Sequence, residues 1–188
     1  MATTQLFVEL LIIGFGGIIW LSLLIVGVFK GTINDFSFLS SPIYVFPIGG
    51  FAYVLGIVTD RIAYGIFRPL EKRNEKGIFK NNNGLTAEEH VYQLNTYSEE
   101  LKSKISYNRS RLRVVRSWTL NFVLIALALV FLRFRLPKFP FEIFYYLLTL
   151  LVILILVTYI VWNELSKDYF NCLKSSFKFL SQKADREE

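Results

Sequence analysis

The sequence predicts an all-α integral membrane protein, a four-helix bundle with both termini in the cytoplasm. Three observations predict this fold: four long apolar runs, an uneven distribution of basic residues between them, and a helical pattern that leads into the third run. Of the 188 residues, 53% are hydrophobic and only 19% are charged, whereas a soluble domain carries about 25% charged residues. The apolar residues are gathered in continuous runs, which is typical of bilayer spans and not of soluble amphipathic helices.

A helix needs about 20 mostly apolar residues to cross a hydrocarbon core about 30 Å thick. The four candidate spans are residues 6–29, 43–67, 118–132 and 141–162. The third is short, so we expect polar residues at its ends to reach the interface by snorkelling. The first has no basic residue before Lys30 and no small-residue cleavage pattern after it, so we expect a retained span and not a signal peptide.

Basic residues set the orientation, because cytoplasmic loops of membrane proteins are enriched in Lys and Arg. With alternating sides, 17 of the 21 basic residues fall on one side of the membrane and four on the other. The side with 17 is therefore predicted to be the cytoplasm, which places both termini there. We expect a multi-pass protein of the bacterial inner (plasma) membrane. Its parts are the first two spans within residues 1–67, a basic cytoplasmic loop over 68–116, two further spans within 117–163 and a cytoplasmic tail over 164–188.

The cytoplasmic loop is predicted to be largely helical. Thr86 and Glu89 form a capping box, and no Pro or Gly follows before Pro137, so a helix beginning near Ala87 is expected to continue into the third span. Apolar residues recur along it at spacings of three and four: Val91, Leu94, Leu101, Ile105, Leu112 and Val115. This stripe fits either packing within the same chain or a heptad seam between two copies.

The tail is predicted to be an amphipathic continuation of the fourth span. Four apolar residues recur there at helical spacing: Phe170, Leu173, Phe177 and Leu180. Such a helix would lie on the membrane or against the loop helix.

Ionisable residues inside a membrane are the best pointers to function. Counting along each span places five polar residues at one inner-leaflet level, here called the polar layer: Glu9, Asp60, Arg61, Asn121 and Glu164. Pairing of Glu9 or Asp60 with Arg61 or Arg116 would make this layer structural. A site for protons or for sensing is the alternative.

A second candidate set is basic and lies about 100° round the loop helix from its apolar stripe: Lys102, Arg109, Arg113 and Arg116. Such residues attract anionic headgroups, and clustered Arg also suits the carboxylates or phosphates of a partner or anion. No aromatic interleaving supports a nucleic-acid partner. With His90 as the only histidine and Cys172 as the only cysteine, the sequence predicts no metal centre, and it predicts no cofactor and no catalytic residue set.

Three functional classes follow, and the third, an enzyme or a transporter, is the least supported because no residue set points to it. The first is a membrane anchor or scaffold subunit of a multi-subunit assembly, which recruits a soluble cytoplasmic protein through the loop helix and tail. The second is a homo-oligomeric pore or membrane-perturbing effector gated from the cytoplasmic side. In architecture the chain resembles the compact four-span proteins of bacterial antiviral defence and nucleotide-signalling operons, which implies a scaffold or effector role.

Overall fold

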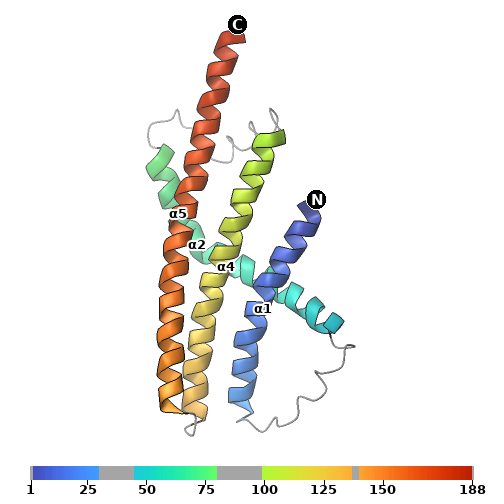
Figure 1. Ribbon diagram of the computed structural model, residues 1–188, viewed down its shortest axis with the longest axis vertical. Coiled ribbons are helices and arrows are strands. Elements are labelled where there is room, and N and C mark those ends of the chain that lie inside the picture. The colour runs from blue at the N-terminus through green and yellow to red at the C-terminus, as the bar shows by residue number, and fades with distance from the viewer. Residues whose placement is uncertain (1, 30–44, 80–98, 137–139, 188) are drawn as a thin grey trace.

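The computed structural model of the protein is all-α and describes residues 2–29, 45–79, 99–136 and 140–187 (Figure 1). The helices in these residues are α1 (Ala2–Val28), α2 (Val45–Phe79), α4 (Glu99–Arg135) and α5 (Phe141–Glu187). All four are long and apolar enough to cross a membrane. The predictions of an all-α fold and of four helices that could span a membrane are therefore confirmed, and these helices suggest a multi-pass membrane protein. The predicted helix start near Ala87, with its Thr86 cap, lies outside the described residues.

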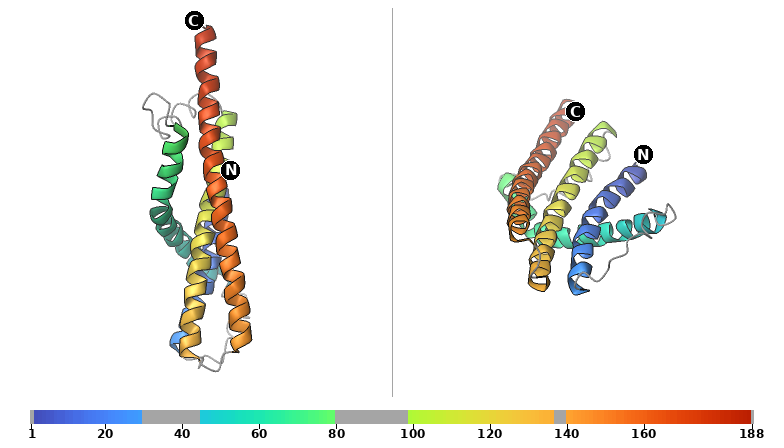
Figure 2. Two further views of the ribbon diagram at one scale, coloured as in Figure 1. Left: turned by 90° about the vertical axis from the view of Figure 1, so that its left-hand side faces the viewer. Right: turned by 60° about the horizontal axis from the view of Figure 1, so that its bottom comes forward.

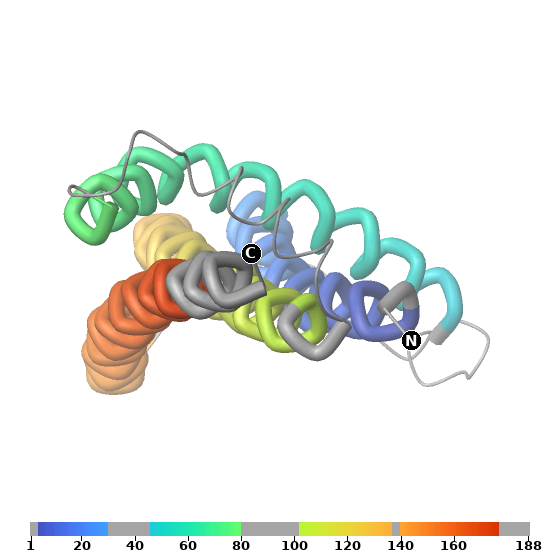
Figure 3. The backbone as a smooth tube through the Cα atoms, turned by 90° about the horizontal axis from the view of Figure 1, so that it is seen from above, coloured from blue at the N-terminus to red at the C-terminus, as the bar shows by residue number. Residues whose placement is uncertain are grey.

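Three helices lie side by side and the fourth crosses them. α4 packs against α1 on one side and α5 on the other, whereas α2 slopes across all three (Figures 1 and 2). Seen from above, α2 passes α1, α4 and α5 in turn (Figure 3). This crossing was not part of the predicted four-helix bundle. Its core between α4 and α5 is built on Ile125, Leu129, Phe144 and Leu151.

Glycines permit the crossing of α1 and α2. A Cβ atom on Gly14 would lie 1.7 Å from the carbonyl oxygen of Ala52, and one on Gly56 would lie 1.9 Å from that of Leu10. Both obstacles are backbone atoms, which cannot rotate away as a side chain can. The two helices therefore touch backbone to backbone, as small residues allow in membranes.

α2 continues through Pro69, which lies within the segment 68–116 that the sequence predicts to be the cytoplasmic loop. Proline has no N–H to donate to the carbonyl four residues earlier, so it bends a helix without necessarily ending it. After the bend, the last turns of α2 run alongside α5 (Figures 1 and 2). Phe79 at the end of α2 is buried against Phe170 and Leu173 of α5, and this packing holds the segment in helical form.

The end of α2, the beginning of α4 and residues 163–176 of α5 form a unit that we call the three-helix platform. Its core contains Ile105 of α4 together with Phe79, Phe170 and Leu173. A neighbouring cluster joins Leu112 of α4 to residues of α2 and α5. The apolar stripe of α4 therefore packs within the chain in its described part, and the first half of the tail packs against the loop helix.

Candidate functional site

The most polar buried site lies where α1, α2 and α4 meet, and it centres on Arg116. The side chain of Arg116 is 7% exposed, and its two terminal nitrogens donate to Asp60 Oδ1 at 3.0 Å and Glu71 Oε1 at 3.1 Å. The guanidinium also lies over the ring of Tyr64, 5.0 Å from its centroid. Arg116 of α4 thus connects two carboxylates that are three turns apart on α2.

Arg113 extends the site to α1. Its guanidinium lies 3.6 Å from a carboxylate oxygen of Glu9 and 3.9 Å from one of Asp60. The hydroxyl of Ser110 donates to the Glu9 carboxylate and accepts a hydrogen bond of 3.4 Å from the Gln5 amide. These bonds join α4 to α1 and α4 to α2, so neither α1 nor α2 can separate from α4 here without exposing a charge.

We call Glu9, Asp60, Glu71, Arg113 and Arg116 the ion-pair cluster. Its helical spacing explains the geometry: Arg113 and Arg116 are three residues apart and share one face of α4. A guanidinium remains charged in proteins and presents a planar set of donors that matches carboxylates. Since burying a charge is costly unless it is paired, the cluster fixes how α1, α2 and α4 meet.

Asn121 lies deeper along α4 and is fully buried. Its amide nitrogen donates to the backbone carbonyl of Ile13 on α1 at 2.9 Å. A Cβ atom on Gly16 would lie 2.3 Å from that same nitrogen. Asn121 therefore joins α1 to α4 directly and depends on Gly16 for the space that it occupies.

The structure brings only part of the predicted polar layer into contacts between helices. Glu9 and Asp60 belong to the ion-pair cluster, and Asn121 lies in the contact between α1 and α4. Arg61 and Glu164 are exposed and make no ion pair with any described residue. Adjacent helical residues point about 100° apart, so Asp60 and Arg61 cannot both face α4.

The predicted basic set is divided in the same way. Arg113 and Arg116 are held by carboxylates, whereas Lys102 and Arg109 are exposed. Glu71 is a cluster residue that sequence reasoning missed. It follows Pro69, in the segment that the sequence predicts to be the cytoplasmic loop. The sequence does contain a signal for Glu71. It lies eleven residues after Asp60, a spacing of about three helical turns that places both carboxylates on one helical face.

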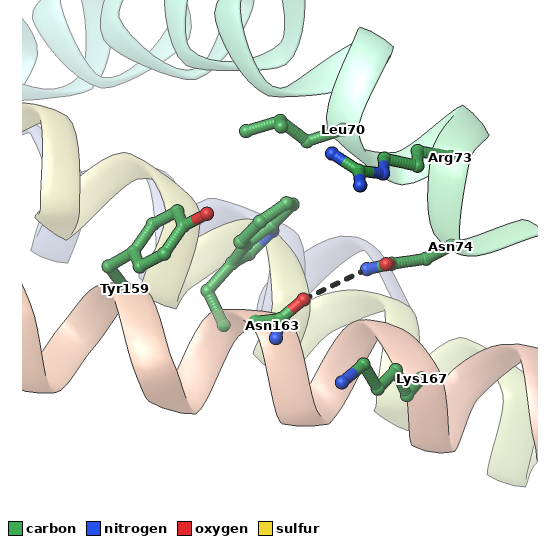
Figure 4. Close-up of a pocket in the computed structure, with 7 residues that line it drawn as sticks. Leu70, Arg73, Asn74, Tyr159, Asn163 and Lys167 are labelled. Carbon is green, nitrogen blue, oxygen red and sulfur yellow. Dashed lines mark hydrogen bonds between the residues drawn. The ribbon is translucent and has the colours of Figure 1, made fainter.

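A second polar feature is a pocket of about 280 Å³ between α2 and α5, shown in Figure 4. The residues that line it are Leu70, Arg73, Asn74, Tyr159, Trp162, Asn163 and Lys167. The Asn74 amide donates to the side-chain oxygen of Asn163 at 3.1 Å and to the Ser166 hydroxyl at 3.3 Å. Figure 4 shows Arg73 of α2 on one side of this pair and Lys167 of α5 on the other.

These features can bind charge and hold helices together. In the ion-pair cluster the charges are paired with one another, whereas the pocket between α2 and α5 presents two exposed cations.

No protein family, characterised protein or solved structure matched the chain in our comparisons.

Proposed function

We propose that this chain is a membrane anchor and scaffold subunit that recruits a soluble cytoplasmic protein. The three-helix platform carries the proposal. α4 and α5 are single helices of 37 and 47 residues. At about 1.5 Å per residue, both exceed the length that a bilayer core requires, so their polar ends project from the membrane as a packed unit.

The connection between platform and spans supports a scaffold. Both α4 and α5 enter the platform without a break, and Trp162 of α5 is buried beside Leu112 of α4 and Phe67 of α2 at the junction. The ion-pair cluster lies at the same junction and adds α1 to it. A partner bound to the platform would therefore be held at a fixed orientation to the membrane.

The platform also presents positive charge. Four basic residues of α4 are exposed there: Lys102, Lys104, Arg109 and Arg111. Complementary charge accelerates association and disfavours wrong partners, so we propose that the recruited protein presents an acidic surface. The excess of basic residues on this side of the spans supports a cytoplasmic location for the platform.

Affinity purification in mild detergent, followed by mass spectrometry of the intact complex, tests this function. A soluble protein should accompany the wild type in a fixed ratio and be lost from the double variant Lys102→Glu with Arg109→Glu. Arg135→Glu is the matched control, since Arg135 is exposed at the opposite end of α4. A complex unaffected by the double variant, or the absence of a soluble protein, would refute the proposal.

A homo-oligomeric pore is the second candidate, and the outer surface of the spans supports it. α5 exposes large apolar side chains along most of its spanning part, including Leu150, Ile153, Leu156 and Ile160. Such a surface must be covered by lipid or by other helices. A homo-oligomer with no soluble partner, which reduces membrane potential when its chain is expressed alone, would favour the pore over the anchor.

A further inference from the structure

We propose that the pocket between α2 and α5 binds the phosphate of an anionic phospholipid. Arg73 of α2 and Lys167 of α5 both line it, and both are exposed. Neither makes an ion pair with another described residue, in contrast to Arg113 and Arg116. Two cations from different helices thus line one cavity, and no described carboxylate lies within ion-pair distance of either. This arrangement suits a bound anion.

Trp162 supplies an independent observation. Its side chain is 1% exposed and lines the pocket, yet its indole N–H has no hydrogen-bond partner among the described residues. Buried polar groups are nearly always satisfied, so an orphaned donor requires an explanation. The nitrogen itself is buried, so a phosphate oxygen in the pocket would accept this bond after a small movement of the side chains that line the pocket.

The ring that carries the donor is held in place. Trp162 packs edge-to-face on Phe67 of α2, with ring centroids 4.6 Å apart, and lies 5.8 Å from Tyr159 on its own helix. The Asn74–Asn163 bond joins the two helices beside it. The indole ring is therefore held beside the pocket before any ligand arrives, which lowers the entropy lost on binding.

The surroundings favour a lipid as the source of the phosphate. Below the pocket, α5 exposes an apolar face that includes Val152, Leu156 and Tyr159, along which acyl chains can lie. Tyr159 lies at the end of this apolar face, as aromatic residues do at the level of headgroups. Basic pockets between helices on the cytoplasmic side typically bind anionic headgroups. A soluble phosphate offers the same anion but would leave the apolar face unused.

Native mass spectrometry of delipidated protein in mild detergent, titrated with phosphatidylglycerol or phosphatidylcholine, tests the proposal. The wild type should bind phosphatidylglycerol more tightly than phosphatidylcholine. In Arg73→Gln with Lys167→Gln, phosphatidylglycerol affinity should fall about 25-fold, because each lost cation costs about fivefold. Lys72→Gln with Lys76→Gln is the matched control, because both lysines are exposed on α2 and neither lines the pocket.

Equal binding of the two lipids, or equal affinity of the pocket variant and the control, would overturn the proposal. Competition by millimolar glycerol 3-phosphate would overturn the lipid as the source and assign the pocket to a soluble phosphate. Trp162→Phe keeps an aromatic ring but removes the N–H, so it should also weaken phosphatidylglycerol binding. Size-exclusion profiles equal to wild type establish that each variant is folded.

Discussion

Replacement of Arg116 by methionine tests whether the ion-pair cluster holds the helices together. The variant keeps a long side chain but leaves Asp60 and Glu71 without the cation that contacts both of them at 3.0 and 3.1 Å. Removing one partner of a buried ion pair costs about 3–5 kcal/mol. The side chains of Asp60 and Glu71 retain 19% and 17% exposure, so we expect the lower end, about 3 kcal/mol in the free energy of unfolding.

Thermal unfolding of the detergent-solubilised protein, followed by fluorescence-detected size exclusion, measures this cost. About 2–4 °C of Tm is lost per kcal/mol in a protein of this length, so Tm should fall by about 6–12 °C. The matched control is Arg61→Met, which removes an exposed Arg one residue from Asp60 and should change stability by less than about 0.5 kcal/mol.

Restoring the charge balance should restore stability. If unpaired carboxylates cause the loss, Asp60→Asn with Glu71→Gln should recover a large part of the Tm lost in the Arg116→Met background, because neutral amides tolerate burial better than lone charges. The reasoning would be refuted if Arg116→Met stayed within about 2 °C of the wild type, or if Arg61→Met lost as much.

Three further predictions use the same thermal assay. Gly14→Ala forces α1 and α2 apart and should lower the free energy of unfolding by about 1–3 kcal/mol or more. The new methyl group of Gly65→Ala meets no atom within 4 Å, so this variant should gain up to about 1 kcal/mol. Equal effects of the two variants would contradict the close crossing. Gly16→Ala should be less harmful in an Asn121→Ala background, because the amide that it meets at 2.3 Å is then gone, and strict additivity would exclude this contact. Leu173→Ala, at a fully buried site, should cost about 2–5 kcal/mol and expose the platform to limited proteolysis, while unchanged protection would contradict its role in the core.

The four membrane-length helices could be predicted because the signal is local. Each apolar run can be recognised without knowledge of its neighbours, and so can the spacing of Ile105 and Leu112 on α4 or of Phe170 and Leu173 on α5. Ile105 does pack with Phe170 and Leu173, whereas Leu112 packs in the neighbouring cluster with Phe67 and Trp162. Their periodicity shows which face of each helix is apolar, but not which helix covers it.

The ion-pair cluster was only partly predictable, because its pairing depends on rotation and crossing. Asp60 and Arg61 lie at one depth, yet only Asp60 faces α4. The slope of α2 across the other helices follows from the contact of Gly14 with Ala52. This contact joins two helices, so it cannot be recognised from the sequence of either helix alone. Pro69 marks a bend instead of an end because residues far away, on α4 and α5, cover Phe79.

Photo-crosslinking in the cells that express this protein naturally tests the scaffold role most directly. A photoreactive amino acid would replace Lys102 or Arg109 on the platform and, as a control, Phe134, which is 83% exposed at the far end of α4. The scaffold role predicts adducts with one soluble protein from positions 102 and 109 and none from 134. Adducts only with lipid or with a second copy of the chain would contradict it.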